Sequence, residues 1–123
     1  MKKITLTCAH AIVKYLISQK ILIDGKKEPL FPGVFGIFGH GNVACLGQAL
    51  EENQNELPTY RGHHEQNMAL TGIGYARAKR RQQIFVATSS VGPGATNMVT
   101  AAAVAMSNRL PILFLHGDTY ANR

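Results

Sequence analysis

Glu65 is the side chain whose type and position point most directly to acid–base chemistry. The residues after it have helical spacing, with Met68, Ala69 and Gly72 on one face, so Glu65 is expected in the first turn of a helix. Unpaired backbone amides at that end of a helix stabilise a carboxylate, and a simple capping role would explain the residue. The helix behind it is rich in alanine and glycine, however, and can pack closely against a neighbour. We therefore treat Glu65 as a candidate proton-transfer group.

A glycine-rich turn precedes Glu65 in the chain. Residues 39–44 read Gly-His-Gly-Asn-Val-Ala, which satisfies the Gly-x-Gly-x-x-Ala pattern of dinucleotide-binding proteins after a predicted strand. That fingerprint also requires an acidic residue about twenty positions further on, where this chain reads Thr-Tyr-Arg-Gly at residues 59–62. A dinucleotide-binding module is therefore an alternative hypothesis that lacks its acidic residue. Glycines that simply permit a tight turn are the simpler interpretation.

A second glycine-rich turn follows Glu65. Residues 89–97 read Ser-Ser-Val-Gly-Pro-Gly-Ala-Thr-Asn, between a predicted strand and a predicted helix. Unpaired amides at a helix start can bind an anion, but the Gly-Lys-Ser/Thr of a phosphate loop is absent. A closely packed seat for a flat ring fits the same glycines. The turn alone does not decide between the two.

The histidines and cysteines do not form a convincing metal site. Adjacent residues on a helix point about 100° apart, so His63 and His64 are poorly placed to share one ion. Cys8 and Cys45 have no metal-ligand spacing either. We predict no metal ligation, and we expect each cysteine to be a small buried apolar side chain.

The elements that must position these groups alternate between helix and strand. The patterns predict helices over residues 7–18 (with Thr7 as N-cap), 43–52, 64–79 and 95–107, strands over 34–38, 58–60, 83–88 and 110–115, and a turn or exposed loop over 24–29. In the first helix the expected buried face carries Ala11, Ile12, Tyr15 and Leu16. Continuously apolar strands separated by helices indicate an α/β fold of three layers, α/β/α, with a mostly parallel sheet. The turns at residues 39–42, 89–94 and 116–119 should therefore line one sheet edge, where such folds bind ligands.

Composition narrows the class of protein. A chain of 123 residues with 46% apolar residues suits one domain. The net charge of +6 comes largely from short basic groups such as Lys79–Arg81, without interleaved aromatic residues, so we expect a solvated surface and no nucleic-acid partner. Apolar runs are too short for a membrane span, and the start lacks the features of a secretory signal. We therefore expect a cytoplasmic protein.

Three motifs in order resemble a known family. They are Phe-Gly-His-Gly-Asn at 38–42, Glu-Gln-x-Met-Ala at 65–69 with Gly-Tyr-Ala-Arg at 74–77, and Thr-Ser-Ser-Val-Gly-Pro-Gly-Ala-Thr-Asn at 88–97. This order is similar to the N-terminal pyrimidine-binding domain of thiamine-diphosphate enzymes of the acetolactate synthase type. The resemblance runs from near Thr5 to the end of the chain, and the third motif is the most specific.

The resemblance implies a role for each candidate residue. The family's glutamate at the position of Glu65 hydrogen-bonds to the aminopyrimidine ring of the cofactor and so promotes loss of the thiazolium C2 proton. By the same matching, Ser89, Gly92 and Asn97 would bind the cofactor. His40 and Asn42 would face the substrate, although some relatives carry a proline and an extra residue in that turn.

Within the family, the Gly-His-Gly-Asn turn and residues 116–123 look most like a branch that hydrolyses a C–C bond of a cyclic diketone in inositol breakdown. An acetolactate synthase or related 2-keto acid decarboxylase is the alternative within the class. A non-catalytic assembly domain is the alternative outside it.

The resemblance also implies parts that this chain lacks. The family holds the diphosphate and Mg²⁺ in a C-terminal domain that opens with Gly-Asp-Gly, a motif absent from these 123 residues. We therefore expect residues 1–123 to be the N-terminal part of a pyrimidine-binding domain, incomplete at its C-terminal end and inactive alone. The family's small-molecule substrate and cofactor sit between subunits of a homodimer or homotetramer.

Overall fold

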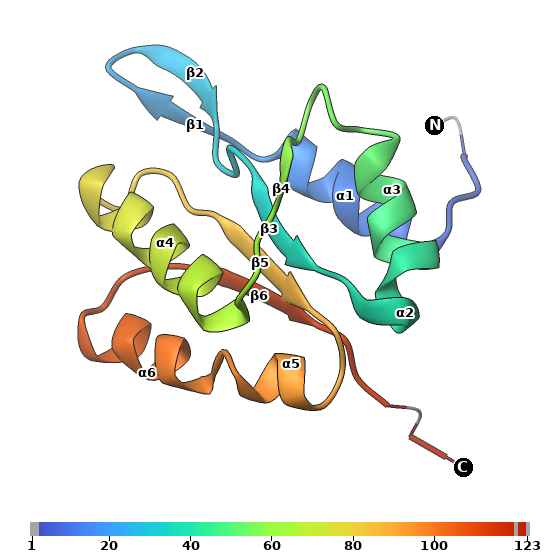
Figure 1. Ribbon diagram of the computed structural model, residues 1–123. Helices are drawn as coiled ribbons and strands as arrows, with labels where there is room; N and C mark the ends of the chain where they lie inside the picture. Colours follow the sequence, from blue (N-terminus) through green and yellow to red (C-terminus); the bar gives the residue numbers. More distant parts are fainter. Residues whose placement is uncertain (1–2, 120, 123) are drawn as a thin grey trace.

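The computed structural model describes residues 3–119 and 121–122 and shows helices on both faces of a parallel sheet (Figure 1). In chain order the elements are α1 (Cys8–Ser18), β1 (Lys20–Ile23), β2 (Lys26–Pro29), β3 (Val34–Ile37), α2 (Gly39–Asn42), the π-helix η1 (Val43–Gly47), α3 (Gln48–Glu51), β4 (Thr59–Arg61), α4 (Glu65–Ala78), β5 (Val86–Ser89), α5 (Pro93–Thr96), α6 (Val99–Ser107) and β6 (Leu113–His116). The predicted three-layer α/β/α architecture is confirmed.

The main sheet has four strands in the order β4-β3-β5-β6, and every pairing within it is parallel. Val86 of β5 is level with Val34 of β3 and with Leu113 of β6. All four residues of β5 are buried because this strand is central and both of its faces are covered. The predicted strands are present, although β5 and β6 each begin three residues later than expected.

Two apolar clusters fill the layers on either side of the sheet. The first packs α1 and the α2–α3 segment against one face: Val13, Leu16, Phe31, Val34, Leu46, Ala49, Leu50, Leu57 and Val86. The second packs α4 and α6 against the other: Met68, Ala69, Ile73, Ala87, Met98, Ala101 and Ala105. Successive strand residues point to opposite faces, so Val86 and Ala87 belong to different clusters. The predicted buried face of α4 is confirmed.

The first helix begins as predicted, with the Thr7 side chain accepting a hydrogen bond from the His10 amide at 3.2 Å. The prediction of which residues of this helix are buried was partly wrong. Val13 and Leu16 enter the core, whereas Tyr15 is 63% exposed and Ala11 is exposed as well. The helix rests on the sheet at a slightly different rotation from the one that the apolar spacing favoured.

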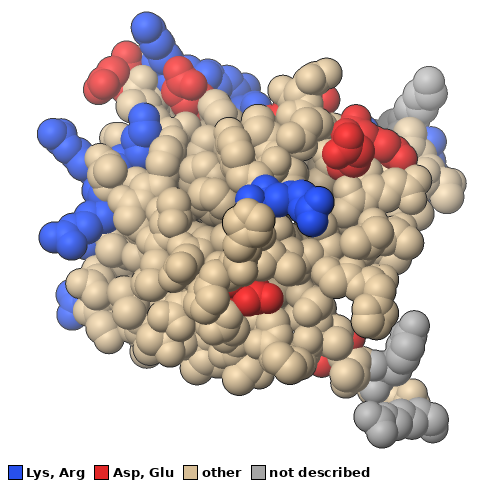
Figure 2. Space-filling view, viewed as in Figure 1, with Lys and Arg blue, Asp and Glu red and all other residues tan. Residues whose placement is uncertain are grey.

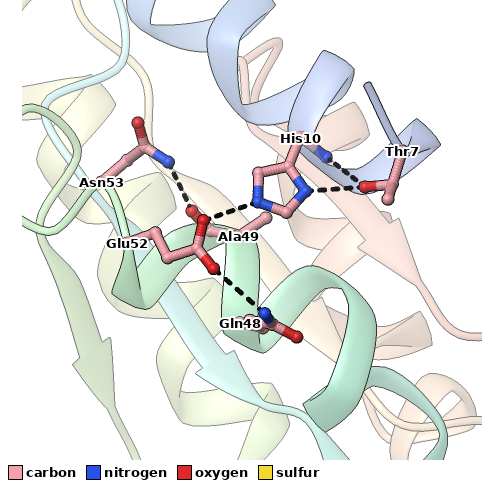
Figure 3. A network of polar contacts seen from close by, with 6 residues as sticks. All are labelled: Thr7, His10, Gln48, Ala49, Glu52 and Asn53. Atoms are coloured by element: carbon pink, nitrogen blue, oxygen red, sulfur yellow. Dashed lines mark hydrogen bonds and ion pairs between the residues drawn. The ribbon is translucent and has the colours of Figure 1, made fainter. Parts of the chain in front are cut away.

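A polar network joins α1 to α3 across this layer (Figure 3). His10 Nε2 lies 2.8 Å from Glu52 Oε2, and the same carboxylate accepts a hydrogen bond from Gln48 at 3.0 Å. The hydrogen bond from His10, and to a smaller extent that from Gln48, holds the pKa of Glu52 below its ordinary value. Thr7 contacts the other ring nitrogen of His10 at 2.7 Å, which orients the imidazole.

Three local expectations were wrong. Residues 26–29 are not a loop but form strand β2, which pairs with β1 in an antiparallel hairpin. Asp24 and Gly25 turn that hairpin with positive φ angles of 49° and 77°, as an Asp-Gly turn favours. Residues 39–42 are helical, so the helix starts four residues earlier and passes through η1 before α3. The helix expected over 95–107 is divided into α5 and α6.

The two cysteines also differ from expectation. Cys8 and Cys45 are both exposed and free, because Cys8 opens α1 and Cys45 lies on the outer side of η1. They line a shallow groove together with apolar residues of α1 and with His116. No helix in the described part of the chain has the length and apolar character needed to cross a membrane.

Candidate functional site

The carboxyl ends of β3, β5 and β6 meet at one edge of the sheet. Because β3 and β5 are neighbours whose following helices leave to opposite faces, a crevice opens between them, which is where open α/β sheets bind ligands. A cavity of about 740 Å³ lies there, lined by residues 39–42, Ser90, Val91, Pro93 and residues 117–119. The prediction that these three turns line one edge is confirmed.

Glu65 is the first residue of α4 and follows the N-cap residue His64. Nδ1 of His64 accepts a hydrogen bond of 3.3 Å from the backbone amide of Asn67. The Glu65 side chain is half-buried. Its Oε2 accepts a hydrogen bond of 2.8 Å from Nδ2 of Asn97, 32 residues along the chain. Among the described residues, Oε1 has no hydrogen-bond partner. One carboxylate oxygen is thus oriented and the other is free for a ligand.

An open groove lies beside this carboxylate, lined by Glu65, Gly92, Pro93, Gly94, Thr96 and Asn97. A Cβ atom added to Gly94 would lie 3.3 Å from Oε1 of Glu65 and 2.7 Å from Oγ of Ser90. The absence of a side chain at Gly94 therefore lets this buried backbone pack closely against the Ser90 hydroxyl and the Glu65 carboxylate. Gly92 has φ 64° and ψ −121°, a conformation that side chains disfavour. Both glycines line the groove beside Glu65.

The groove and the cavity are neighbours that share Pro93. Of the residues predicted from sequence, Glu65, Gly92 and Asn97 line the groove, whereas His40 and Asn42 line the cavity. Residues 90–94 thus separate Glu65 and Asn97 from His40 and Asn42.

Ser89 lines neither hollow. It is fully buried at the end of β5, its hydroxyl donates to the Ser90 carbonyl at 3.1 Å, and it lies 3.1 Å from Nδ1 of His116. The backbone carbonyl of Ser89 accepts a 3.0 Å hydrogen bond from the side-chain amide (Nδ2) of Asn42. In this arrangement Ser89 supports Asn42 and His116.

Three features of the site were not predicted from the sequence. Gly39 has φ 58°, and a Cβ there would collide with Cβ of Ser90, so the first two turns touch because this residue is glycine. Asp118 lines the cavity with His40 and was visible only as part of the 116–119 turn. Asn97 was identified as a cofactor residue, but its contact with Glu65 had no sequence signal.

The fold and this site define a class of protein. The chain belongs to the family described as thiamine pyrophosphate enzyme, N-terminal TPP binding domain, which matches residues 8–122. Because that match accounts for both glycine turns, the dinucleotide-binding alternative is not favoured.

Three similar proteins carry the same name. The chain is 54% identical over 123 residues to 3D-(3,5/4)-trihydroxycyclohexane-1,2-dione hydrolase of Geobacillus thermodenitrificans and 50% identical over 123 residues to the protein of that name in Clostridium tetani. It is also 50% identical over 122 residues to the protein of that name in Listeria innocua. These alignments cover 99–100% of the chain but 19% of each relative, so the chain spans about a fifth of their length.

Proposed function

We propose that this chain is the cofactor-activating part of a thiamine-diphosphate-dependent hydrolase that cleaves a C–C bond of 3D-(3,5/4)-trihydroxycyclohexane-1,2-dione in inositol breakdown. The observation that carries the proposal is the Glu65 carboxylate, oriented by Asn97 at 2.8 Å in a groove that Gly92 and Gly94 also line. Identity of 50–54% to relatives with this hydrolase name supports the choice of substrate.

The residues present fit the aminopyrimidine ring of thiamine diphosphate. The ring is planar, and the groove beside Glu65 is lined by Gly92 and Gly94, which carry no side chains. Thiamine diphosphate, when bound, supplies the carbon nucleophile that the reaction needs. Glu65 Oε1 would hold the proton shared with a ring nitrogen, and Asn97 would keep the carboxylate pointed at that nitrogen.

The neighbouring cavity suits a polyhydroxylated substrate. Its polar side chains include the His40 imidazole, the Asn42 amide and the Asp118 carboxylate, all suited to hydrogen-bonding hydroxyl groups. The Asn42 amide nitrogen is already used by the Ser89 carbonyl, which leaves the Asn42 oxygen for a ligand. Pro93, common to both hollows, would lie between the cofactor ring and the substrate.

The proposal extends to parts outside this chain. Among the described residues no three His, Cys, Asp or Glu side chains are grouped so as to hold a metal ion. We assign the diphosphate and Mg²⁺ to a separate C-terminal domain, and residues 1–123 to the N-terminal part of the pyrimidine-binding domain. We further propose a cytoplasmic homodimer or homotetramer with the cofactor between subunits.

Glu65→Gln in the complete enzyme tests the catalytic role. Loss of a positioned acid–base group should slow exchange of the cofactor C2 proton, followed by NMR in D₂O, by about 10²–10⁴-fold. Glu56→Gln removes the same charge from an exposed position and should leave exchange unchanged. Equal exchange rates in the Glu65 variant and the unmodified enzyme would clear Glu65 of the role.

The substrate is tested separately on the unmodified enzyme. We expect turnover of the ring diketone and little turnover of pyruvate. Preferential use of pyruvate would identify the acetolactate synthase type instead, without affecting the role of Glu65.

A further inference from the structure

We propose that a pocket between the C-terminal ends of α4 and α6 binds a phosphate or phosphomonoester dianion. The pocket has a volume of about 320 Å³ and is lined by Arg77, Arg81, Asn108 and Leu110. Glu65 and Arg77 lie at opposite ends of α4, and a helix of that length spans roughly 20 Å. The pocket is therefore separate from the groove beside Glu65.

Both helices end in the same backbone arrangement. The Arg81 amide donates to the Ala76 carbonyl at 2.7 Å, and the Leu110 amide donates to the Ala105 carbonyl at 2.9 Å. These six-to-one bonds close Schellman motifs, in which a left-handed residue, usually glycine, follows the helix. Here the left-handed residues are arginines: Arg80, Arg81 and Arg109 have φ angles of 51°, 64° and 52°.

A side-chain hydrogen bond joins the two helix ends. Arg81 Nε donates to the carbonyl of Arg109 at 2.9 Å, which fixes the Arg81 guanidinium across the gap. The Arg77 side chain makes no hydrogen bond among the described residues, so its five guanidinium donors are available. Two guanidinium groups on one small pocket suit a phosphate dianion, whose tetrahedral group offers several oxygens and which arginine binds in bidentate fashion.

The surrounding charge is not neutralised. In the part of the chain that the structure describes, the one ion pair joins His10 to Glu52, so no lysine or arginine is paired. Figure 2 shows basic side chains gathered on the side where α4 ends and the β1–β2 hairpin projects, with acidic atoms there lying over the hairpin. An anion in the pocket would meet a surplus of positive side-chain charge, which the negative ends of the α4 and α6 dipoles offset in part.

Neutralisation of the helix ends is the simpler explanation of these cations. It accounts less well for Arg77 and Arg81 facing one pocket, because backbone amides already satisfy the Ala76 and Ala105 carbonyls. Asn108 donates to the Val104 carbonyl at 2.9 Å, which leaves its side-chain oxygen for a ligand hydroxyl. Leu110 supplies an apolar wall for an organic group.

Titration calorimetry of the purified protein with inorganic phosphate and with glycerol phosphate, at constant ionic strength, tests the proposal. We expect saturable binding of one anion, at least tenfold weaker in Arg77→Gln and in Arg81→Gln. Arg80→Gln is the matched control, because Arg80 has the same charge and left-handed backbone conformation as Arg81 but does not line the pocket. The affinity of this variant for the anion should stay within twofold of that of the unmodified protein.

The two probes distinguish the source of the phosphate. Tighter binding of glycerol phosphate would identify an organic phosphate as the ligand, and tighter binding of inorganic phosphate would identify the free ion. Absence of saturable binding, or an equal loss in Arg80→Gln, would overturn the proposal. If Arg81→Gln alters the circular dichroism spectrum, Arg77→Gln decides the question, since the Arg77 side chain makes no hydrogen bond that the fold would lose.

Discussion

Asn97→Ala probes the contact that orients the proposed catalytic carboxylate. The Asn97 amide donates to Glu65 at 2.8 Å, and both side chains are half-buried. A hydrogen bond to a charged group contributes about 1.5–3 kcal/mol, and partial exposure places this one near the lower end, at about 1.5 kcal/mol. For a chain of this length such a loss lowers Tm by roughly 3–6 °C. Urea denaturation measures the free energy of unfolding directly.

A double-mutant cycle with Glu65→Ala isolates this contact from other effects. We expect a coupling energy of about 1 kcal/mol between positions 65 and 97, typical of residues in direct contact. The same cycle between Glu65→Ala and Asn55→Ala, an exposed asparagine, should be additive. Additivity within about 0.3 kcal/mol at the 65–97 pair would refute the reasoning, because the hydrogen bond would then have no energetic effect.

Three further perturbations test other parts of the structure. Gly94→Ala places a Cβ 2.7 Å from Oγ of Ser90 and 3.3 Å from Oε1 of Glu65, so we expect about 1–3 kcal/mol of destabilisation in urea. We also expect weaker binding of thiamine diphosphate to the complete enzyme by calorimetry, and unchanged affinity would contradict a role for this close packing in the groove. Met98→Ala, at a side chain only 1% exposed, should cost about 2–5 kcal/mol by urea denaturation, whereas Met106→Ala, 85% exposed, should stay within about 0.5 kcal/mol. Hydrogen bonds from His10 of α1 and Gln48 of α3 lower the pKa of Glu52, so the stability that this carboxylate contributes is present above its unfolded pKa and is lost as the pH falls below about 4.3. Glu52→Gln should therefore flatten the acid limb of a curve of unfolding free energy against pH, and an unchanged limb would contradict the network.

Much of the fold follows from local patterns. The apolar spacing of residues 64–79 predicted the buried face of α4, and the apolar runs around Phe35 and Val86 predicted buried parallel strands. Where Lys26–Pro29 pairs in a hairpin, three charged residues and a proline obscured the strand, although the Asp-Gly turn was a usable signal. The exposed cysteines escaped prediction because residue type reports average burial, whereas the position of each side chain on its helix decides the individual case.

The amino-acid sequence by itself determined the alternation of helices and strands, the glycine turns at one sheet edge and the acid between them, since these depend on periodicity and chain order. Only the tertiary structure decided that Asn97 reaches Glu65, that the 90–94 turn divides a groove from a cavity, and that Ser89 is buried behind both. The reason is physical. Contacts between residues far apart in the chain depend on strand order and on the distance between packed helices, and neither is encoded in the spacing of any single segment.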